Sequence, residues 1–316
     1  MRASFFLLLA FSAVGAGQSL LPAGRSMPVP PDAAFQNLQV FWSRGYAIYA
    51  SDDTGSVTVY DTSGNQPSMV NQIRIWPDQT SQLNLVHAAA SADGSIFAVS
   101  GAAFASAGTS TSFLALFGRS GPVKLIQLPN TGLFRVAFAD DGTLWAIARE
   151  VDSTWTDLPE YNTLRHYDST GKLLGSVLPV STFSTKRAPM YTPSLSVTAD
   201  TVGVYFDRAK TWVELGYDGA VKGRWTVPDT LAPASRRPHP GWIYLTASDQ
   251  IVRLSWTSGK QQSDFASTVE YLTKTGSSLT SAPVYVPPSA YAFYYGIQGD
   301  QLIWQKAGLL NWGTIK

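Results

Sequence analysis

Side chains able to bind a ligand gather in one short segment of this sequence. Asp152, Asp157 and Glu160 provide carboxylates, and Trp155 and Tyr161 provide aromatic rings, all between positions 152 and 161. An exposed aromatic ring can stack on a sugar ring, and nearby carboxylates can bind its hydroxyls or a cationic peptide. The alternative is a solvated rim with weak ion pairs, which contribute little stability. Both interpretations of this segment stay open.

Basic side chains gather in two later segments. Lys186 and Arg187 form one pair, Arg236 and Arg237 form another, and His239 follows the second pair. We expect both segments to be connections between structural repeats, where ligand-binding residues are often found. Packing of neighbouring repeats would bring the first pair close to the acidic and aromatic segment. These five residues complete the candidate ligand-binding set.

Patterns typical of enzymes are missing. His87, His166 and His239 are not arranged in the HExxH spacing of a zinc hydrolase. The sequence also lacks the GxSxG, GxxxxGK[ST] and GxGxxG motifs of serine hydrolases and nucleotide-binding proteins. His87 alternates with Leu85 on a segment that we expect to be an inner strand, which makes it a candidate to face a central channel. No cofactor and no metal site is evident, and the pattern favours a protein that is not an enzyme.

Composition limits the class of protein and of partner. The chain has 316 residues, of which 45% are hydrophobic and 14% charged, so it has ample apolar material for a core. Lys and Arg number 23 and Asp and Glu 22, and this balance argues against nucleic acid as a partner. There is no cysteine, which excludes disulfides, thiolate metal sites and lipid-modified cysteines.

The N-terminal residues have the features of a signal peptide. Arg2 supplies a positive charge, Ala3 to Val14 is almost wholly apolar, and Gly15 and Ala16 are small residues suited to cleavage. The apolar run is too short to span a bilayer as an uncleaved anchor, and no later run is long enough. We therefore predict that residues 1–16 are removed and that the mature protein is periplasmic or secreted.

A repeated turn predicts the fold. Tyr167-Asp168-Ser169-Thr170-Gly171 lies between two apolar segments, and related turns recur along the chain with glycine at 64, 121, 171, 219, 259 and 308. The mean spacing of about 49 residues matches one four-stranded blade of a β-propeller. Second hairpins lie upstream, for example at Asp93-Gly94 and Asp141-Gly142. The prediction is an all-β, six-bladed propeller over residues 38–316; a pair of β-sandwich domains would need a period near 100 residues.

The repeats resemble a known family. Asp141-Gly142-Thr143-Leu144-Trp145 and the turn at 167–171 are similar to units of the TolB-like, NHL-like and gluconolactonase-like six-bladed propellers. This resemblance implies the fold but no single function, because such propellers include enzymes, binding proteins and scaffolds. Lactonases of this group hold a divalent cation in the channel with carboxylate and amide oxygens. Asp140, Asp141 and Asp200 are candidates here, although the turn that contains each one already explains it.

The expected blade topology suggests how the ring closes and where a ligand binds. Residues 17–37 precede the blades, and Ser19-Leu20-Leu21-Pro22 resembles the blade ends, so this segment could pair with the last blade. Turns at one face of the ring are short, whereas four connections at the other face are long. They are 101–111, 149–163, 180–193 and 229–240. We expect the ligand site on this long-loop face.

Three functions are compatible with these features. The favoured one is a monomeric binding or interaction module whose partner is a protein, a peptide or a carbohydrate. The alternative is a metal-assisted lactone or ester hydrolase, or a lyase, with its site in the central channel. The third is a repeat domain derived from a larger adhesin. Carboxylate and amide side chains converging in the channel would favour the enzyme, whereas an apolar channel would count against it.

Overall fold

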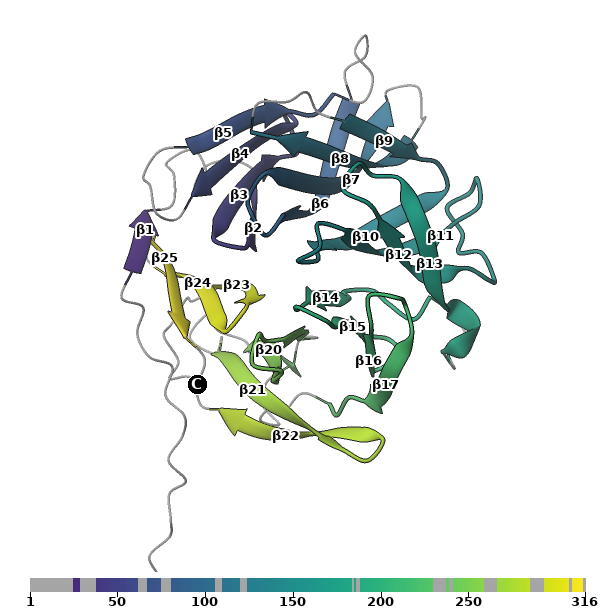
Figure 1. Cartoon of the computed structure of the whole chain (residues 1–316), viewed down its shortest axis with the longest axis vertical. Helices are drawn as coiled ribbons and strands as arrows, with labels where there is room; N and C mark the ends of the chain where they lie inside the picture. The colour runs from purple at the N-terminus through teal and green to yellow at the C-terminus, as the bar shows by residue number, and fades with distance from the viewer. Residues whose placement is uncertain are drawn as a thin grey trace, which may run out of the picture.

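The computed structural model describes most of the chain as β-structure arranged in a ring, which confirms the predicted all-β propeller arrangement (Figure 1). The residues that it describes are 25–28, 38–61, 67–74, 81–105, 110–119, 124–183, 185, 188–229, 237–238, 241–258, 266–284, 293–306 and 309–314. The predicted signal peptide lies outside these residues. No helix in these ranges is long and apolar enough to cross a membrane.

Three consecutive four-stranded antiparallel sheets begin the ring. The first contains β2 (Leu38–Ser43), β3 (Tyr46–Ser51), β4 (Ser56–Asp61) and β5 (Pro67–Gln72). The second contains β6 (Ser81–Ala90), β7 (Ile96–Ala105), β8 (Ser110–Gly118) and β9 (Lys124–Leu128). The third contains β10 (Thr131–Phe138), β11 (Leu144–Glu150), β12 (Asn162–Tyr167) and β13 (Leu173–Pro179), followed by the short helix η2 (Val180–Thr182).

A nine-stranded sheet follows, and it consists of two antiparallel units. The first unit contains β14 (Ser194–Val197), β15 (Val202–Phe206), β16 (Thr211–Leu215) and β17 (Val221–Thr226). The second contains β18 (Arg237–Pro238), β19 (Trp242–Leu245), β20 (Ile251–Ser258), β21 (Ala266–Thr275) and β22 (Ser278–Val284). A single parallel residue pair, Thr226 with Ser278, joins the two units through β17 and β22.

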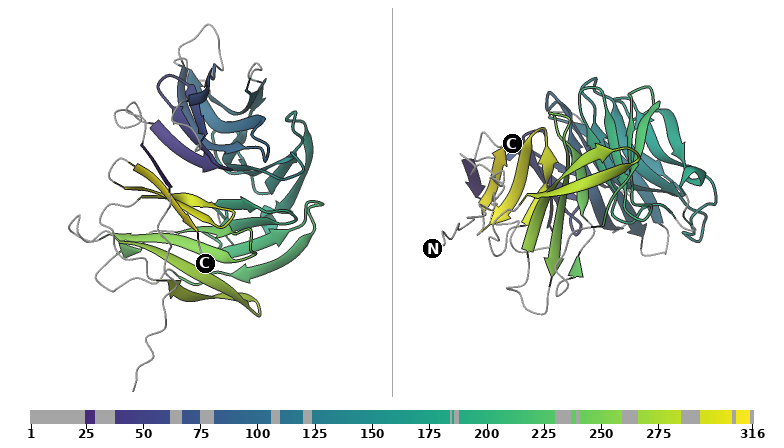
Figure 2. Two further views of the ribbon diagram at one scale, coloured as in Figure 1. Left: turned by 60° about the vertical axis from the view of Figure 1, so that its left-hand side comes forward. Right: turned by 90° about the horizontal axis from the view of Figure 1, so that it is seen from below.

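The last sheet joins the two ends of the chain. It contains β23 (Phe293–Gln298), β24 (Gln301–Lys306), β25 (Leu309–Thr314) and, as its outer strand, β1 (Arg25–Pro28). β1 and β25 are antiparallel neighbours, with Met27 opposite Leu310, and they lie together in both side views (Figure 2). β1 lies within residues 17–37, the segment expected to pair with the last blade, whereas Ser19–Pro22, whose resemblance to the blade ends suggested the pairing, lies outside the described residues.

The predicted Asp-Gly hairpins are confirmed where the structure describes them. Gly142, Gly171 and Gly219 have φ near +80°, a backbone conformation that glycine adopts without strain. The Asp168 carboxylate accepts hydrogen bonds from the backbone N–H groups of Thr170 and Lys172 at 2.8 and 2.9 Å. These bonds, together with one from the Thr170 hydroxyl, lower the pKa of Asp168. Tight turns of this kind set the register of the outer hairpins.

The last two predicted turns lie between different strands of their sheets than the first four do. The glycines at 64, 121, 171 and 219 lie between the third and fourth strands of their sheets, whereas Gly259 lies between β20 and β21 and Gly308 between β24 and β25. The corresponding turn after β21 is at Gly276, with φ of +58°. The difference at Gly308 arises because the fourth strand of that sheet is β1, which comes from the other end of the chain.

The core lies between adjacent sheets. Trp145 and Trp212 are the largest fully buried side chains, and each is on the second or third strand of its sheet. One cluster joins the first and second sheets through residues such as Ile48 and Phe97, and another joins the third sheet to β14–β17 through Leu164 and similar residues. Burial of these apolar faces holds neighbouring sheets together.

The innermost strand of each unit is an edge strand, and side chains of the neighbouring unit satisfy its backbone groups. The Ser43 Oγ accepts the N–H of Ala90 at 2.9 Å, which joins β2 to β6. The Ser194 Oγ accepts the N–H of Ile243 at 2.9 Å, and the Ser196 Oγ accepts that of Leu245 at 3.1 Å, which joins β14 to β19. These side chains replace the strand partner that an edge lacks.

Replacing Ser194 with Ala is therefore expected to destabilise the protein by about 1–3 kcal/mol, because the buried N–H of Ile243 loses its acceptor. Chemical denaturation measures the change, and Ser169→Ala in an exposed hairpin turn is the control, with an expected effect within about 0.5 kcal/mol. Equal effects of the two substitutions would show that this bond between the units contributes nothing.

Candidate functional site

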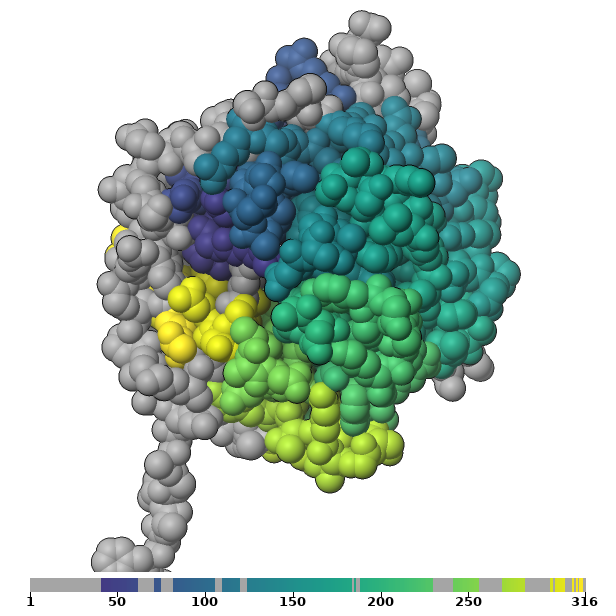
Figure 3. Space-filling view, viewed as in Figure 1, coloured from purple at the N-terminus to yellow at the C-terminus, as the bar shows by residue number. Residues whose placement is uncertain are grey.

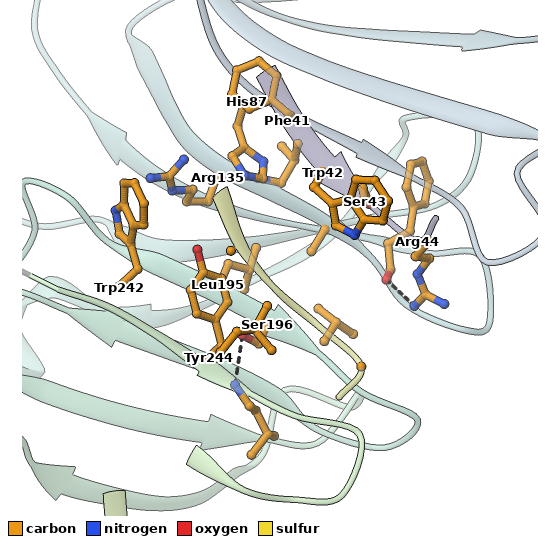
Figure 4. A pocket seen from close by; sticks show the side chains of 18 of the residues that line it. Phe41, Trp42, Ser43, Arg44, His87, Arg135, Leu195, Ser196, Trp242 and Tyr244 are labelled. Carbon is orange, nitrogen blue, oxygen red and sulfur yellow. Dashed lines mark hydrogen bonds between the residues drawn. The ribbon is translucent and has the colours of Figure 1, made fainter. Parts of the chain in front are cut away.

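A cavity of about 530 Å³ lies at the centre of the ring. All of the innermost strands contribute to its wall, namely β2, β6, β10, β14, β19 and β23. In the space-filling view, segments from the whole length of the chain meet around this centre (Figure 3). A close view shows the side chains that project into it (Figure 4). They include Phe41, Trp42, Ser43, Arg44, His87, Arg135, Leu195, Ser196, Trp242 and Tyr244.

β-Bulges position several of the residues in this wall. The register of β6 against β7 shifts between Leu85 and His87, and that of β10 against β11 shifts between Leu133 and Arg135. A third shift, in β23 against β24, comes directly before Gly296. A bulge rotates the residues that follow it and is common next to functional sites. His87, Arg135 and Gly296 each follow a bulge, and all three line the cavity.

Arg135 brings a positive charge into the cavity. Its Nε donates to the backbone carbonyl of Pro193 at 3.0 Å, and its guanidinium lies 5.7 Å from the ring centre of Trp242, within the range of a cation–π interaction. Burial lowers its pKa, but a guanidinium keeps its proton at neutral pH. No Asp or Glu is among the described residues that line the cavity. The charge of Arg135 therefore lacks a carboxylate partner in this part of the structure.

His87, on the adjacent inner strand β6, lies beside Arg135 and is neutral. Its Nδ1 accepts the backbone N–H of Val136 at 3.4 Å, and its ring packs 5.4 Å from that of Phe41. Burial, and then the nearby charge of Arg135, hold the pKa of His87 well below its usual value. Because Nδ1 is the acceptor, the single proton of the neutral ring is on Nε2, which makes that nitrogen a donor.

Tyr244 supplies a third polar group. Burial raises the pKa of its phenol to about 12, so the hydroxyl keeps its proton, and Arg135 opposes this shift. Figure 4 shows the hydroxyl pointing from β19 into the cavity between Arg135 and Leu195. Gly296 packs against this side chain, and a Cβ at that position would lie 3.0 Å from the Tyr244 oxygen. The glycine thus makes room for the tyrosine.

The second arginine in the wall is already neutralised. Arg44 Nη1 lies 2.6 Å from the Asp140 carboxylate, and its Nη2 donates to the carbonyl of Phe138 at 2.9 Å. Its φ is +49°, which is uncommon for a residue other than glycine. Arg44 therefore connects the first and third sheets beside the cavity, whereas the charge of Arg135 is available to a ligand.

The predicted acidic and aromatic site is the connection between β11 and β12. Trp155 is 38% exposed, as a ligand-binding aromatic would be, and its Nε1 donates to the Ser110 Oγ at 3.0 Å. Asp152 accepts the backbone N–H groups of Thr154 and Thr156. These contacts give Asp152 and Trp155 a role in shaping the connection itself.

The other three candidate residues of that segment, Asp157, Glu160 and Tyr161, are paired with nearby side chains or buried. Asp157 lies 3.4 Å from the Arg149 guanidinium, and Glu160 accepts the Ser181 hydroxyl at 2.9 Å. Tyr161 is buried, with 6% of its surface exposed, so its ring is not available to a ligand at the surface.

One of the four connections that were expected to be long, 101–111, is short, because β7 and β8 extend through most of it.

The basic candidates are mostly outside the described residues. Lys186, Arg187, Arg236 and His239 are not described, and only the backbone of Arg237 is, in the pairing of β18 with β20.

The three candidate cation ligands are held in other interactions or turns. Asp140 pairs with Arg44, Asp141 accepts hydrogen bonds within its turn, and Asp200 lies 3.4 Å from Lys222. No cluster of three or more His, Asp or Glu side chains that could hold a metal ion occurs among the residues that the structure describes.

One of the three polar groups in the cavity could be predicted from the sequence. His87 was a candidate to face the channel, and it does so, although a bulge and not simple alternation orients it. Arg135 and Tyr244 were missed. The available signal for Arg135 was a single cation within the apolar inner strand Leu133–Ala139. Tyr244 and Trp242 lie on β19, which is an innermost strand.

Comparisons with known proteins find similarity to solved structures at low sequence identity. No protein-family model and no curated protein matches the sequence. Among solved structures, hydrazine synthase of Kuenenia stuttgartiensis is similar at 14% identity over 84% of this chain and 72% of that chain, with a TM-score of 0.49. The Malassezia sympodialis allergen Mala s 1 has 9% identity over 83% and 82% of the two chains, also with a TM-score of 0.49. A luciferin-regenerating enzyme has 10% identity over 92% and 95%, with a TM-score of 0.47.

The neutral state of buried His87 predicts how stability depends on pH. An unfolded histidine takes up a proton near pH 6.5, whereas folded His87 does so only at lower pH, so stability falls as the pH drops below 6.5. Between pH 7 and 5.5 we expect His87 to account for a loss of about 1 kcal/mol.

Urea denaturation of wild type and His87→Asn at the two pH values tests this effect. Asparagine keeps an acceptor for Val136 but does not titrate, so the variant should lose less stability on acidification. Some dependence will remain, because burial also lowers the pKa of His166. An unchanged pH dependence in His87→Asn would contradict the prediction.

Proposed function

We propose that the protein is an exported binding protein that holds a small-molecule ligand in the central cavity of a six-bladed propeller. The observation that carries the proposal is the cavity itself, which has the volume and the mixed aromatic and polar wall of a ligand pocket. Polar and apolar groups share the wall about equally, and the polar groups can orient a ligand while the apolar groups supply contact area.

The count of six blades treats the nine-stranded sheet as two. Each of its units has its own innermost strand, β14 or β19, and a single residue pair, Thr226 with Ser278, joins the units by strand pairing. With this division, each blade contributes one inner strand to the cavity. The six-fold arrangement of the wall supports the count.

Binding is favoured over the metal-assisted alternative. A lactonase-like site needs several carboxylate or amide oxygens around a cation, whereas the cavity wall, as far as it is described, presents an arginine, a neutral histidine and a tyrosine. The cavity is also favoured over the long-loop face. The side chains around Trp155 that the structure describes are engaged with their own loop or with neighbouring strands.

Export is the second part of the proposal. Its support is the positive charge, apolar run and small residues of positions 1–16. Expression of the full chain in a bacterial host with a working export system should give a periplasmic or secreted product whose first residue is near Gly17. Edman sequencing of that product tests the cleavage, and a cytoplasmic product that retains Met1 and Arg2 would contradict it.

Three compounds with one ring system test the cavity, namely 2-naphthoate, 2-naphthamide and 2-naphthylmethylamine. We expect at least one to bind with 1:1 stoichiometry in titration calorimetry. Val86→Trp should weaken that binding at least tenfold, because Val86 lines the cavity and the larger ring would fill part of it.

Trp155→Ala is the matched control on the long-loop face, and it should leave the affinity unchanged while lowering the stability by about 1 kcal/mol, because the hydrogen bond to Ser110 is lost. Thermal unfolding confirms that Val86→Trp is folded. Absence of binding by all three compounds, or binding that Trp155→Ala removes and Val86→Trp does not, would overturn the proposed site.

A further inference from the structure

We infer that the ligand is an organic monoanion, an aromatic or aliphatic carboxylate, whose head group is held by Arg135, Tyr244 and His87. The inference rests on the proposed function, because it names the chemical class that the cavity selects. It follows from the charge of the cavity, from the hydrogen-bonding capacity of the three side chains and from the apolar wall around them.

The charge of the cavity comes from Arg135. Removing a guanidinium from water is costly unless an anion or several acceptors replace the water. In the structure, the Arg135 Nε donates a hydrogen bond to the Pro193 carbonyl, and the face of Trp242 lies near the guanidinium. Asp140, which belongs to the β10–β11 turn, is paired with Arg44. A ligand anion would therefore be the counter-charge of Arg135 within the described part of the cavity.

All three polar groups line the cavity, and each carries a hydrogen-bond donor. The guanidinium of Arg135 has only donors. The Tyr244 hydroxyl keeps its proton, since its pKa is about 12. The Nε2 of His87 carries the ring proton because Val136 occupies Nδ1. A carboxylate is the complementary group, because its two oxygens only accept hydrogen bonds.

The balance of charge favours a monoanion. Arg135 supplies one positive charge, and His87 is neutral because burial and Arg135 lower its pKa. A carboxylate neutralises this charge, whereas a phosphate dianion would leave a net negative charge in a site of low dielectric constant. A sulfonate has the same charge and the same acceptors as a carboxylate, so the two are compared directly in the experiment below.

The rest of the wall fits an apolar ligand body. Phe41, Trp42, Leu195, Val197 and Trp242 line the cavity around the three donors. Trp242 already stacks with the guanidinium of Arg135, so an aromatic ring beside it would extend the same stack. An acid with a ring or a short branched chain satisfies both parts of the site.

Charge selectivity is the test of this inference. In wild type, 2-naphthoate should bind roughly 10- to 100-fold more tightly than its neutral isostere 2-naphthamide, which is the difference expected from charge-assisted hydrogen bonds. Arg135→Gln should remove most of this preference, whereas Arg135→Lys should keep part of it because the positive charge remains. Tyr244→Phe should weaken 2-naphthoate binding by about tenfold or less.

Two further measurements complete the experiment. Arg149→Gln is the matched control, because Arg149 is paired with Asp157 and does not line the cavity. This variant should keep the preference for 2-naphthoate over 2-naphthamide. In wild type, 2-naphthalenesulfonate should bind less tightly than 2-naphthoate, because the two oxygens of a carboxylate fit the three donors. 2-Naphthyl phosphate should bind more weakly than either compound. Circular dichroism and thermal unfolding report whether each variant is folded.

The outcomes separate this inference from the proposed function. Equal binding of naphthoate and naphthamide to wild type, or a preference that survives Arg135→Gln, would overturn the carboxylate site and leave a binding cavity. Tighter binding of naphthyl phosphate than of naphthoate would overturn the choice of a monoanion. Absence of binding by all naphthyl compounds would instead overturn the proposed function.

Discussion

The backbone edges of the innermost strands are the constraint on which the rest of this structure depends. Each inner strand pairs on one side and faces the axis of the ring on the other, so its free N–H and C=O groups need partners from outside its own sheet. Side chains of the neighbouring unit provide them, as Ser43 does for Ala90 and Ser194 for Ile243. The same contacts that satisfy each edge therefore connect one unit to the next, and packing of the apolar faces completes the junction.

These contacts between neighbouring units also determine the chemistry of the cavity. His87 accepts the N–H of Val136 on the adjacent inner strand, and that bond fixes the proton on its other nitrogen. Arg135 donates to the Pro193 carbonyl just before β14, and that bond holds its guanidinium beside Trp242. Both residues follow β-bulges, which rotate them toward the axis. Residues that join neighbouring units are thus also the residues that give the cavity its positive charge and its hydrogen-bond donors.

Closure of the ring imposes a second constraint. A ring of sheets has a junction at which the two ends of the chain must meet, and here β1 adds the outer strand to the sheet formed by β23, β24 and β25. Four residue pairs join β1 to β25. The proposed ligand site depends on this junction, because β2 and β23 on either side of it both line the cavity. Loss of the junction would open the wall beside Gly296 and Phe41.

The sequence by itself determined the all-β class, the propeller arrangement and the Asp-Gly hairpins, because these depend on local alternation and on turn residues such as Asp168 and Gly171. It also pointed to His87. Only the tertiary structure placed Arg135 and Tyr244 beside it, because residues from β6, β10 and β19 meet through the closure of the ring and through bulges that alternation does not reveal. The segment around Trp155 was prominent in the sequence for the opposite reason, since its residues are clustered along the chain. Proximity in sequence produced a loop whose side chains contact the loop itself and neighbouring strands, whereas proximity in space produced the cavity.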